Sequence, residues 1–236
     1  MIRDHLDKNN LHHAYLLEGV REEIIPEIMA FMEELGIATS NNPDFCEIHI
    51  DNFKMDEAMF LRGMTEEKSF VGGKKIFIIS ANQFSLDAEH ALLKMFEEPK
   101  KDTHFFLLVP EKGMLLPTLL SRFYHIQAPL QDKDTKEVEA FLKMSSTARI
   151  NFLKDFLKID DEDEEVLATD SVRAKSLRFL NILETVIHNN FLGVQHQDPG
   201  VEHLFKQIFQ VRKFLRQPGS STKSLMESLA LIVPNY

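Results

Sequence analysis

Three groups of residues in this 236-residue chain have the types and spacing that could do chemistry. Gly19 follows a short apolar stretch and begins the run Gly-Val-Arg-Glu-Glu-Ile-Ile-Pro, which could be the start of a phosphate-binding loop. Glu97 and Glu98 are adjacent carboxylates of the kind used in acid–base catalysis. The third group is a loose set of histidines that could suggest a metal site: His188, His196 and His203. Whether each group forms a site depends on the residues around it.

The run that begins at Gly19 lacks most of a phosphate loop. Such a loop needs glycines that bring backbone N–H groups against the phosphates, a lysine for the terminal phosphates and a Ser or Thr for magnesium. Only Gly19 matches, since Ile25 falls about where the lysine would be and Pro26 about where the hydroxyl would be. Glu22 and Glu23 would place negative charge against a triphosphate. The simpler interpretation is a helix start, with both glutamates favouring the helix dipole and Pro26 in the first turn.

The carboxylate pair and the histidines are weaker candidates. Adjacent helix positions do not converge on one substrate, so Glu97 and Glu98 favour a solvated or interface role. No two of the three histidines have the i, i+4 spacing of a helical metal pair, and no carboxylate completes a site. The sequence therefore predicts neither a metal site nor a bound cofactor. Cys46 is the single cysteine, which excludes an internal disulfide, is consistent with the cytoplasm and is typical of a small buried residue on a strand.

Short apolar runs and helical patterns alternate through the amino-terminal half. Five runs are predicted as strands: residues 14–18, 46–50, 75–80, 105–109 and 123–127. Continuous apolar runs of this length suit strands that are covered on both faces of a parallel sheet. Between the third and fourth runs, apolar residues at helical spacing predict a helix that begins after Ser85, its N-cap, and stops at Pro99. This alternation predicts a three-layer α/β domain with a mostly parallel sheet.

Two ordered motifs then carry a family resemblance. They are ALLKMFEEP (residues 91–99) and LLPTLLSRF (residues 115–123). They resemble the ALLK-x-LEEP and LLPT-x-x-SRC motifs of the AAA+ domain of bacterial replicative clamp-loader subunits, at the expected separation. HAYLLE (residues 13–18) and PDFCEI (residues 43–48) resemble the first two strands of that domain. Over about its first 130 residues the chain resembles a DNA polymerase III clamp-loader subunit of the delta-prime type.

The resemblance implies a P-loop NTPase-like fold with a degenerate nucleotide site. It places Ile79 and Ser80 where carboxylates that hold magnesium and activate water would stand, and neither can do that work. The polar sensor position falls near Pro110 and Glu111 instead of the usual Thr or Asn. With one cysteine, the chain also cannot build the four-cysteine zinc module that many family members carry. We therefore expect this chain neither to bind nor to hydrolyse ATP usefully, and to need no cofactor.

Arg122 is the exception in this degenerate site. The resemblance places it on the arginine of the SRC motif, which reaches a neighbouring subunit and contacts its bound ATP. A guanidinium suits this task because it is always charged and offers a planar fork of donors to phosphate oxygens. We expect Arg122 to be a catalytic arginine finger acting in trans, although Phe123 replaces the cysteine of the motif. The alternative is that Arg122 caps the preceding short helix through Ser121, facing its C-terminal carbonyls.

From about residue 131 onward only helical patterns appear. They cover residues 135–144, 147–157, 171–188, 201–216 and 224–232. The resemblance divides the chain into an AAA+-like α/β domain (1–130), an abbreviated helical lid or linker (131–165) and an all-α, collar-like oligomerisation domain (166–236). The acidic run DDEDEE (residues 160–165) is predicted to be solvated linker. The alternative to a collar is an isolated helical bundle with no partner.

Charge and hydropathy limit the partners. The net charge is −10, and the basic clusters are small, which does not favour independent binding of DNA. The chain contains no 18-residue apolar run, so no membrane span is predicted, and the first residues lack the apolar core of a signal peptide. The resemblance implies a cytoplasmic assembly with the motor (tau/gamma) and delta subunits. In that assembly the sliding clamp and primed DNA are contacted indirectly, through the complex.

The resemblance thus predicts a non-catalytic subunit that supports ATP-driven loading of the sliding clamp. Two other functions stay open on the sequence alone. One is an inactive AAA+-fold interaction module outside replication, because a fold does not fix a function. The other is an ATPase that binds nucleotide through an unusual loop.

Overall fold

The computed structural model describes residues 2–70, 72–129, 132–158, 172–191, 199–217 and 220–234. The chain forms two compact units, Met1–Pro129 with Val166–Ser171, and Leu130–Glu165 with Val172–Tyr236. The division predicted at residues 130 and 165 into domain, lid and collar stays a prediction. The acidic run at residues 160–165 lies outside the described residues.

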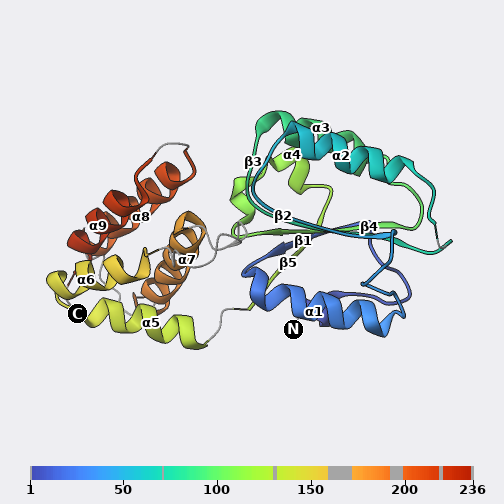
Figure 1. Ribbon diagram of the computed structural model, residues 1–236. Coiled ribbons are helices and arrows are strands. Elements are labelled where there is room, and N and C mark those ends of the chain that lie inside the picture. Colours follow the sequence, from blue (N-terminus) through green and yellow to red (C-terminus); the bar gives the residue numbers. More distant parts are fainter. Residues whose placement is uncertain are drawn as a thin grey trace. The chain divides into compact units, whose positions relative to one another are not determined.

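The first unit is built on a five-stranded parallel sheet with the strand order β2-β3-β4-β1-β5 (Figure 1). The strands are β1 (Ala14–Glu18), β2 (Phe45–Phe53), β3 (Lys75–Phe84), β4 (Thr103–Val109) and β5 (Tyr124–Gln127). Each predicted strand is present. The order places β1 between β4 and β5: the chain passes from β1 to the edge strand β2 and then returns through β3 and β4 to β5, so the direction of winding reverses at β2. Parallel neighbours need crossover connections, and the helices between the strands supply them.

Helices cover both faces of this sheet (Figure 1). They are the 3₁₀ helix η1 (Ile2–His5), α1 (Arg21–Glu34), α2 (Met55–Glu66), α3 (Leu86–Glu97), the 3₁₀ helix η2 (Lys112–Met114) and α4 (Pro117–Leu120). α1 packs on one face, and α2, α3 and α4 pack on the other. The predicted three-layer α/β architecture with a parallel sheet is confirmed.

Alternate residues of each strand contribute to two separate cores. In β1, Ala14 and Leu16 pack in the core beneath α2, α3 and α4, whereas Tyr15 and Leu17 pack in the core beneath α1. All four side chains are buried. Burial on both faces explains why the strand sequences are continuous apolar runs instead of alternating ones.

β3 extends past the apolar run that predicted it. The predicted strand ends at Ser80, whereas β3 continues to Phe84. Phe84 is paired with Phe53 of β2, their rings stack with centroids 5.1 Å apart, and the Ser85 N–H donates to the Phe53 carbonyl at 2.9 Å. This pairing with a distant strand overrides the polar residues after Ser80. α3 begins as predicted, because Ser85 Oγ accepts a hydrogen bond from the Ala88 N–H at 3.3 Å.

The second unit is helical in its described part. Its helices are α5 (Asp132–Lys143), α6 (Ser146–Phe156), α7 (Val172–Phe191), α8 (Pro199–Leu215) and α9 (Thr222–Ile232). The predicted all-α character of the carboxy-terminal part is confirmed over its described residues. An aromatic cluster joins α5, α6 and α7, with ring centroids 5.1 to 6.1 Å apart, and consists of Phe141, Phe152, Phe156 and Phe179. Over the described residues, no helix combines the length and the apolar character that a membrane span requires.

Arg149 of α6 is fully buried and joins the ends of two other helices. Its guanidinium donates to the carbonyls of Phe141 and Leu142 near the end of α5, and to those of Val233 and Pro234 after α9. The guanidinium carbon also lies 5.7 Å from the centroid of the Phe141 ring. Carbonyls at helix C-termini lack partners within the helix, so one buried arginine satisfies several of them.

Candidate functional site

The junction between β1 and α1 is a two-residue turn made by Gly19 and Val20. Gly19 has a φ of +152°, and a Cβ atom on it would stand 2.7 Å from the Cβ of Ala128. Its N–H donates to the carbonyl of Val109 at 3.0 Å. The glycine therefore permits close packing against the chain that follows β5. Its N–H is used by β4 and does not point to a free phosphate site.

α1 occupies the segment in which a phosphate loop would lie. The helix begins at Arg21, so Pro26 is its sixth residue and the prediction that Pro26 lies in the first turn is wrong. The reason is that Val20 acts as an extended N-cap, whose carbonyl accepts the N–H groups of Glu23 and Ile24. The acidic first turn favours the helix dipole, as predicted. With two residues, the connection from β1 to α1 is too short to surround a phosphate.

The positions of the missing carboxylates are buried. Ile79 packs in the core, and Ser80 of β3 is fully buried with a hydroxyl that has no hydrogen-bond partner among the described residues. Ser80 is paired with His49 of β2. Burial, with the charge of Arg21 as the second cause, lowers the pKa of His49 to about 4. A neutral imidazole and a buried hydroxyl cannot replace the carboxylates of a magnesium site.

The structure describes two of the three histidines that were considered for a metal site. His188 and His203 are exposed on α7 and α8, and His196 lies outside the described residues. In the described ranges, no three or more His, Cys, Asp or Glu side chains are grouped so that they could hold a metal ion. His125 of β5 instead pairs with Glu18 of β1, with 2.8 Å between Nε2 and Oε2. This pair links two neighbouring strands.

Arg122 directly follows Ser121, the C-cap of α4. Its Nη1 donates to the carbonyl of Thr118 and, at 3.1 Å, to Oγ of Ser121. Its Nη2 forms an ion pair with Oε1 of Glu97 at the end of α3, and the arginine side chain is 26% exposed. The contacts with Thr118 and Ser121 are those of the helix-capping alternative. Action of Arg122 on a neighbouring subunit stays a prediction.

A second glutamate of α3 holds the other end of α4. Glu89 is buried, and its Oε2 accepts the N–H of Leu116, the N-cap of α4, at 2.6 Å. Burial raises the pKa of Glu89, and the hydrogen bond from Leu116 opposes that rise. Glu89 and Glu97 are eight residues apart and therefore share a face of α3. Sequence reasoning missed both contacts, for which this spacing was the only signal.

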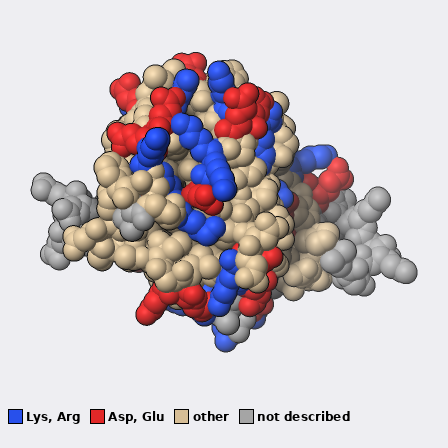
Figure 2. All heavy atoms as spheres, turned by 90° about the vertical axis from the view of Figure 1, so that its right-hand side faces the viewer, with Lys and Arg blue, Asp and Glu red and all other residues tan. Residues whose placement is uncertain are grey.

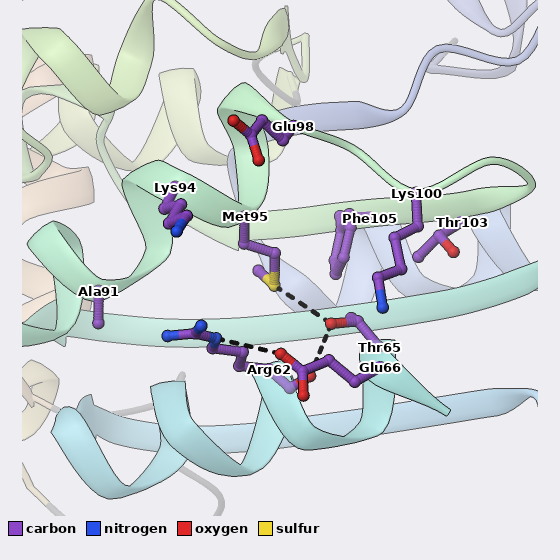
Figure 3. Close-up of a pocket in the computed structure, with 10 residues that line it drawn as sticks. All are labelled: Arg62, Thr65, Glu66, Ala91, Lys94, Met95, Glu98, Lys100, Thr103 and Phe105. Carbon is purple, nitrogen blue, oxygen red and sulfur yellow. Dashed lines mark hydrogen bonds and ion pairs between the residues drawn. The ribbon is translucent and has the colours of Figure 1, made fainter. Parts of the chain in front are cut away.

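A cavity of about 110 Å³ lies between α2 and α3, and Figure 3 shows the residues that line it. Charged side chains of both signs line it: Arg62, Glu66, Lys94, Glu98 and Lys100. In the figure Arg62 pairs with Glu66, and Thr65 approaches the sulfur of Met95. Lys94 and Glu98 thus line the α2 side of α3. Glu97, in contrast, pairs with Arg122 beside α4.

Lys75, at the start of β3, has a structural role. Lys75 is buried, and its Nζ donates to the carbonyls of Met64 and Glu67 at 2.9 and 2.8 Å, at the end of α2. Cations at helix C-termini complement the helix dipole. On the face shown in Figure 2, blue basic and red acidic side chains are interspersed. That mixture is typical of a solvated surface and unlike the basic stripe of a DNA-binding face.

The sheet order, the helical crossovers and the short β1–α1 turn define the class of protein. The first unit is an AAA+-like, P-loop NTPase-like α/β domain without a phosphate loop in its described β1–α1 connection, and an all-α part follows. Residues 32–131 match the family model described as "DNA polymerase III, delta subunit". The predicted resemblance to clamp-loader subunits of the delta-prime type is confirmed by this match and by two curated relatives.

Both relatives are DNA polymerase III delta′ subunits. The one from Bacillus subtilis (strain 168) is 30% identical over 161 residues, covering 59% of this chain and 48% of that protein. The one from Pseudomonas aeruginosa is 29% identical over 99 residues, covering 40% of this chain and 30% of that protein. The chain therefore matches about half the length of these relatives, or less.

Solved structures of clamp-loader proteins are also similar. A DNA polymerase III gamma subunit-related protein from Thermotoga maritima aligns with a TM-score of 0.46 and 13% identity, over 94% of this chain and 93% of that chain. The clamp loader delta protein of Bacillus subtilis aligns with a TM-score of 0.39 and 15% identity, over 99% and 88%.

Proposed function

We propose that this chain is a non-catalytic, delta-prime-like subunit of a DNA polymerase III clamp loader. Its role is to support ATP-driven loading of the sliding clamp on primed DNA, in the cytoplasm, without hydrolysing ATP itself. The matches to two delta′ subunits support the place in the complex. The observation that carries the non-catalytic role is the two-residue turn at Gly19 and Val20, since α1 begins before a phosphate loop can form.

The proposed partners are the motor (tau/gamma) and delta subunits. The net charge of −10 and the interspersed charges in Figure 2 support an indirect contact with DNA, through subunits that hold the phosphates themselves. The sliding clamp and primed DNA are then substrates of the whole complex, to which this chain contributes structure.

Arg122 is the residue that we propose acts on a partner, as an arginine finger. Its side chain is 26% exposed and directly follows the C-cap of α4, the helix whose N-terminus Glu89 fixes. A guanidinium that is held in a fixed orientation suits an arginine that binds phosphate oxygens already held by another subunit. The helix-capping contacts with Thr118 and Ser121 support the same presentation, because they orient the side chain that is presented.

Reconstitution with the cognate motor and delta subunits tests this function. We expect the chain to enter the complex and to be required for clamp loading, while the isolated chain binds no ATP in a titration that detects binding by the isolated motor subunit. ATP binding by the isolated chain would favour an ATPase with an unusual loop. Failure to associate with the motor subunits would favour an interaction module outside replication.

A further inference from the structure

The guanidinium of Arg122 has little free donor capacity in the isolated chain. An arginine carries five N–H groups. The two on Nη1 serve the Thr118 carbonyl and Ser121 Oγ, and one on Nη2 serves Glu97. Nε is buried and has no partner among the described residues. One N–H on Nη2 is therefore left, whereas a bidentate grip on a phosphate needs two.

Glu97 is the partner that can be exchanged at the smallest cost. Its side chain is 49% exposed, so water can solvate the carboxylate once the arginine leaves. Its release makes both N–H groups of Nη2 available, while Nη1 keeps its two contacts at the end of α4. A terminal phosphate carries more negative charge than one carboxylate and offers three oxygens, so it is the stronger partner for the same donors.

We infer that Glu97 is a positioning residue that holds Arg122 in an ion-paired state until a neighbouring subunit presents a nucleotide phosphate. This inference rests on the proposed function, because the phosphate belongs to a partner. Glu97 holds the guanidinium against the end of α3 in the free subunit and competes with the phosphate for Nη2. Glu89 has a different part, because it fixes the start of α4 and does not touch the arginine.

The adjacent glutamate provides a matched control. Glu98 follows Glu97 in the chain, is exposed and lines the cavity on the α2 side of α3 (Figure 3). Replacing either glutamate by glutamine removes one negative charge from the same end of α3. Only Glu97→Gln removes the charge that pairs with Arg122, so a difference between the two variants reports the pair and not the net charge.

The first experiment measures ATP hydrolysis by the cognate motor subunits as this chain is titrated in. Since exposed ion pairs change an equilibrium by about two- to fivefold, Glu97→Gln is expected to lower the concentration for half-maximal stimulation by that factor. Glu98→Gln is expected to leave that concentration unchanged. An unchanged or raised concentration for Glu97→Gln, or an equal shift for Glu98→Gln, would overturn the inference.

A second readout separates this inference from the proposed function. NMR of the isolated chain can measure how fast the Arg122 guanidinium rotates about its Cζ–Nη bonds. Slow rotation reports the ion pair with Glu97 in the absence of any partner subunit. We expect faster rotation in Glu97→Gln than in the wild type and in Glu98→Gln. Equal rotation rates in the wild type, Glu97→Gln and Glu98→Gln would overturn the inference of an ion-paired state. If rotation differs but Arg122→Ala stimulates the motor subunits as well as the wild type does, the finger function fails and the ion pair is structural only.

Discussion

The β1–α1 junction and the α3–α4 pair belong to the same α/β unit but use their polar groups in opposite ways. At the junction, the Gly19 N–H donates to the Val109 carbonyl of β4, and the Val20 carbonyl accepts the first N–H groups of α1. At the end of α4, Arg122 holds partners that are partly exposed. The difference is that the segment in which a phosphate loop would lie is used for packing, whereas Arg122 makes partly exposed contacts, which we propose that another molecule can replace.

The largest effect is expected from Gly19→Ala, which tests whether the junction serves packing. Alanine would be strained at a φ of +152° and would bring its Cβ within 2.7 Å of the Ala128 Cβ. We expect the free energy of unfolding to fall by about 2 to 4 kcal/mol. Chemical denaturation measures it.

Gly63→Ala is the control for this change. Gly63 lies within α2, and a Cβ there would meet nothing within 4 Å. We expect this variant to gain about 0.5 to 1 kcal/mol, because alanine is the better helix residue. Equal effects of the two substitutions would show that the junction is not tightly packed.

Next in size is the buried contact at the start of α4. Glu89→Leu leaves the Leu116 N–H without its acceptor, and we expect a loss of about 1 to 3 kcal/mol in the free energy of unfolding. Glu89→Gln keeps an acceptor and removes a charge that burial disfavours, so it should lie close to the wild type. If Glu89→Leu unfolded at the wild-type denaturant concentration, α4 would be held by packing alone.

A smaller effect is the pH dependence of stability caused by His49 of β2. The folded-state pKa of His49 is about 4, below the ordinary value of 6.5, so the unfolded chain binds more protons between these values. The contribution of His49 is therefore fully present above pH 6.5 and is lost as the pH falls toward 4. His13 and His104 act in the same direction, because burial lowers the pKa of both.

Denaturation midpoints at pH 7.5 and pH 5 measure this effect. We expect His49→Asn to reduce the loss of stability between the two pH values relative to the wild type. Burial raises the pKa of Glu47 and Glu89, which opposes the histidines, so the difference between variant and wild type is the informative quantity. An identical loss in both proteins would contradict the half-buried, neutral state of His49.

The smallest effect on stability is expected from Arg122→Met. The ion pair with Glu97 is partly exposed on both sides, and such pairs contribute less than about 1 kcal/mol. Thermal or chemical unfolding should therefore match the wild type closely. A loss as large as that of Gly19→Ala would mean that Arg122 serves the fold, and the contrast between the two regions would fail.

More of the fold than of the candidate site could be predicted from the sequence. Strands such as β4 are buried on both faces, so their apolar runs stand out without knowledge of their neighbours. The extension of β3 to Phe84 depends on pairing with β2, and the early start of α1 at Arg21 depends on the tight turn at Gly19; local patterns contain neither.

In the candidate site, too, contacts between separate elements could not be predicted from local sequence patterns. The motif placed Arg122 after a short helix, where the structure has it. Its contact with Glu97 depends on how α3 packs against α4, which residue types and spacing do not determine. For that reason the adjacent glutamates suggested only a solvated or interface role, and the pair of contacts by which α3 holds α4 was missed.

The most direct test of the account is ATP hydrolysis by the cognate clamp loader assembled with wild-type chain or with Arg122→Ala. Co-elution of the subunits first establishes that both forms assemble. The account predicts that the wild-type chain stimulates hydrolysis and that the variant assembles equally well without doing so, because the guanidinium acts on the partner's phosphate. Equal stimulation by both assembled forms would contradict it.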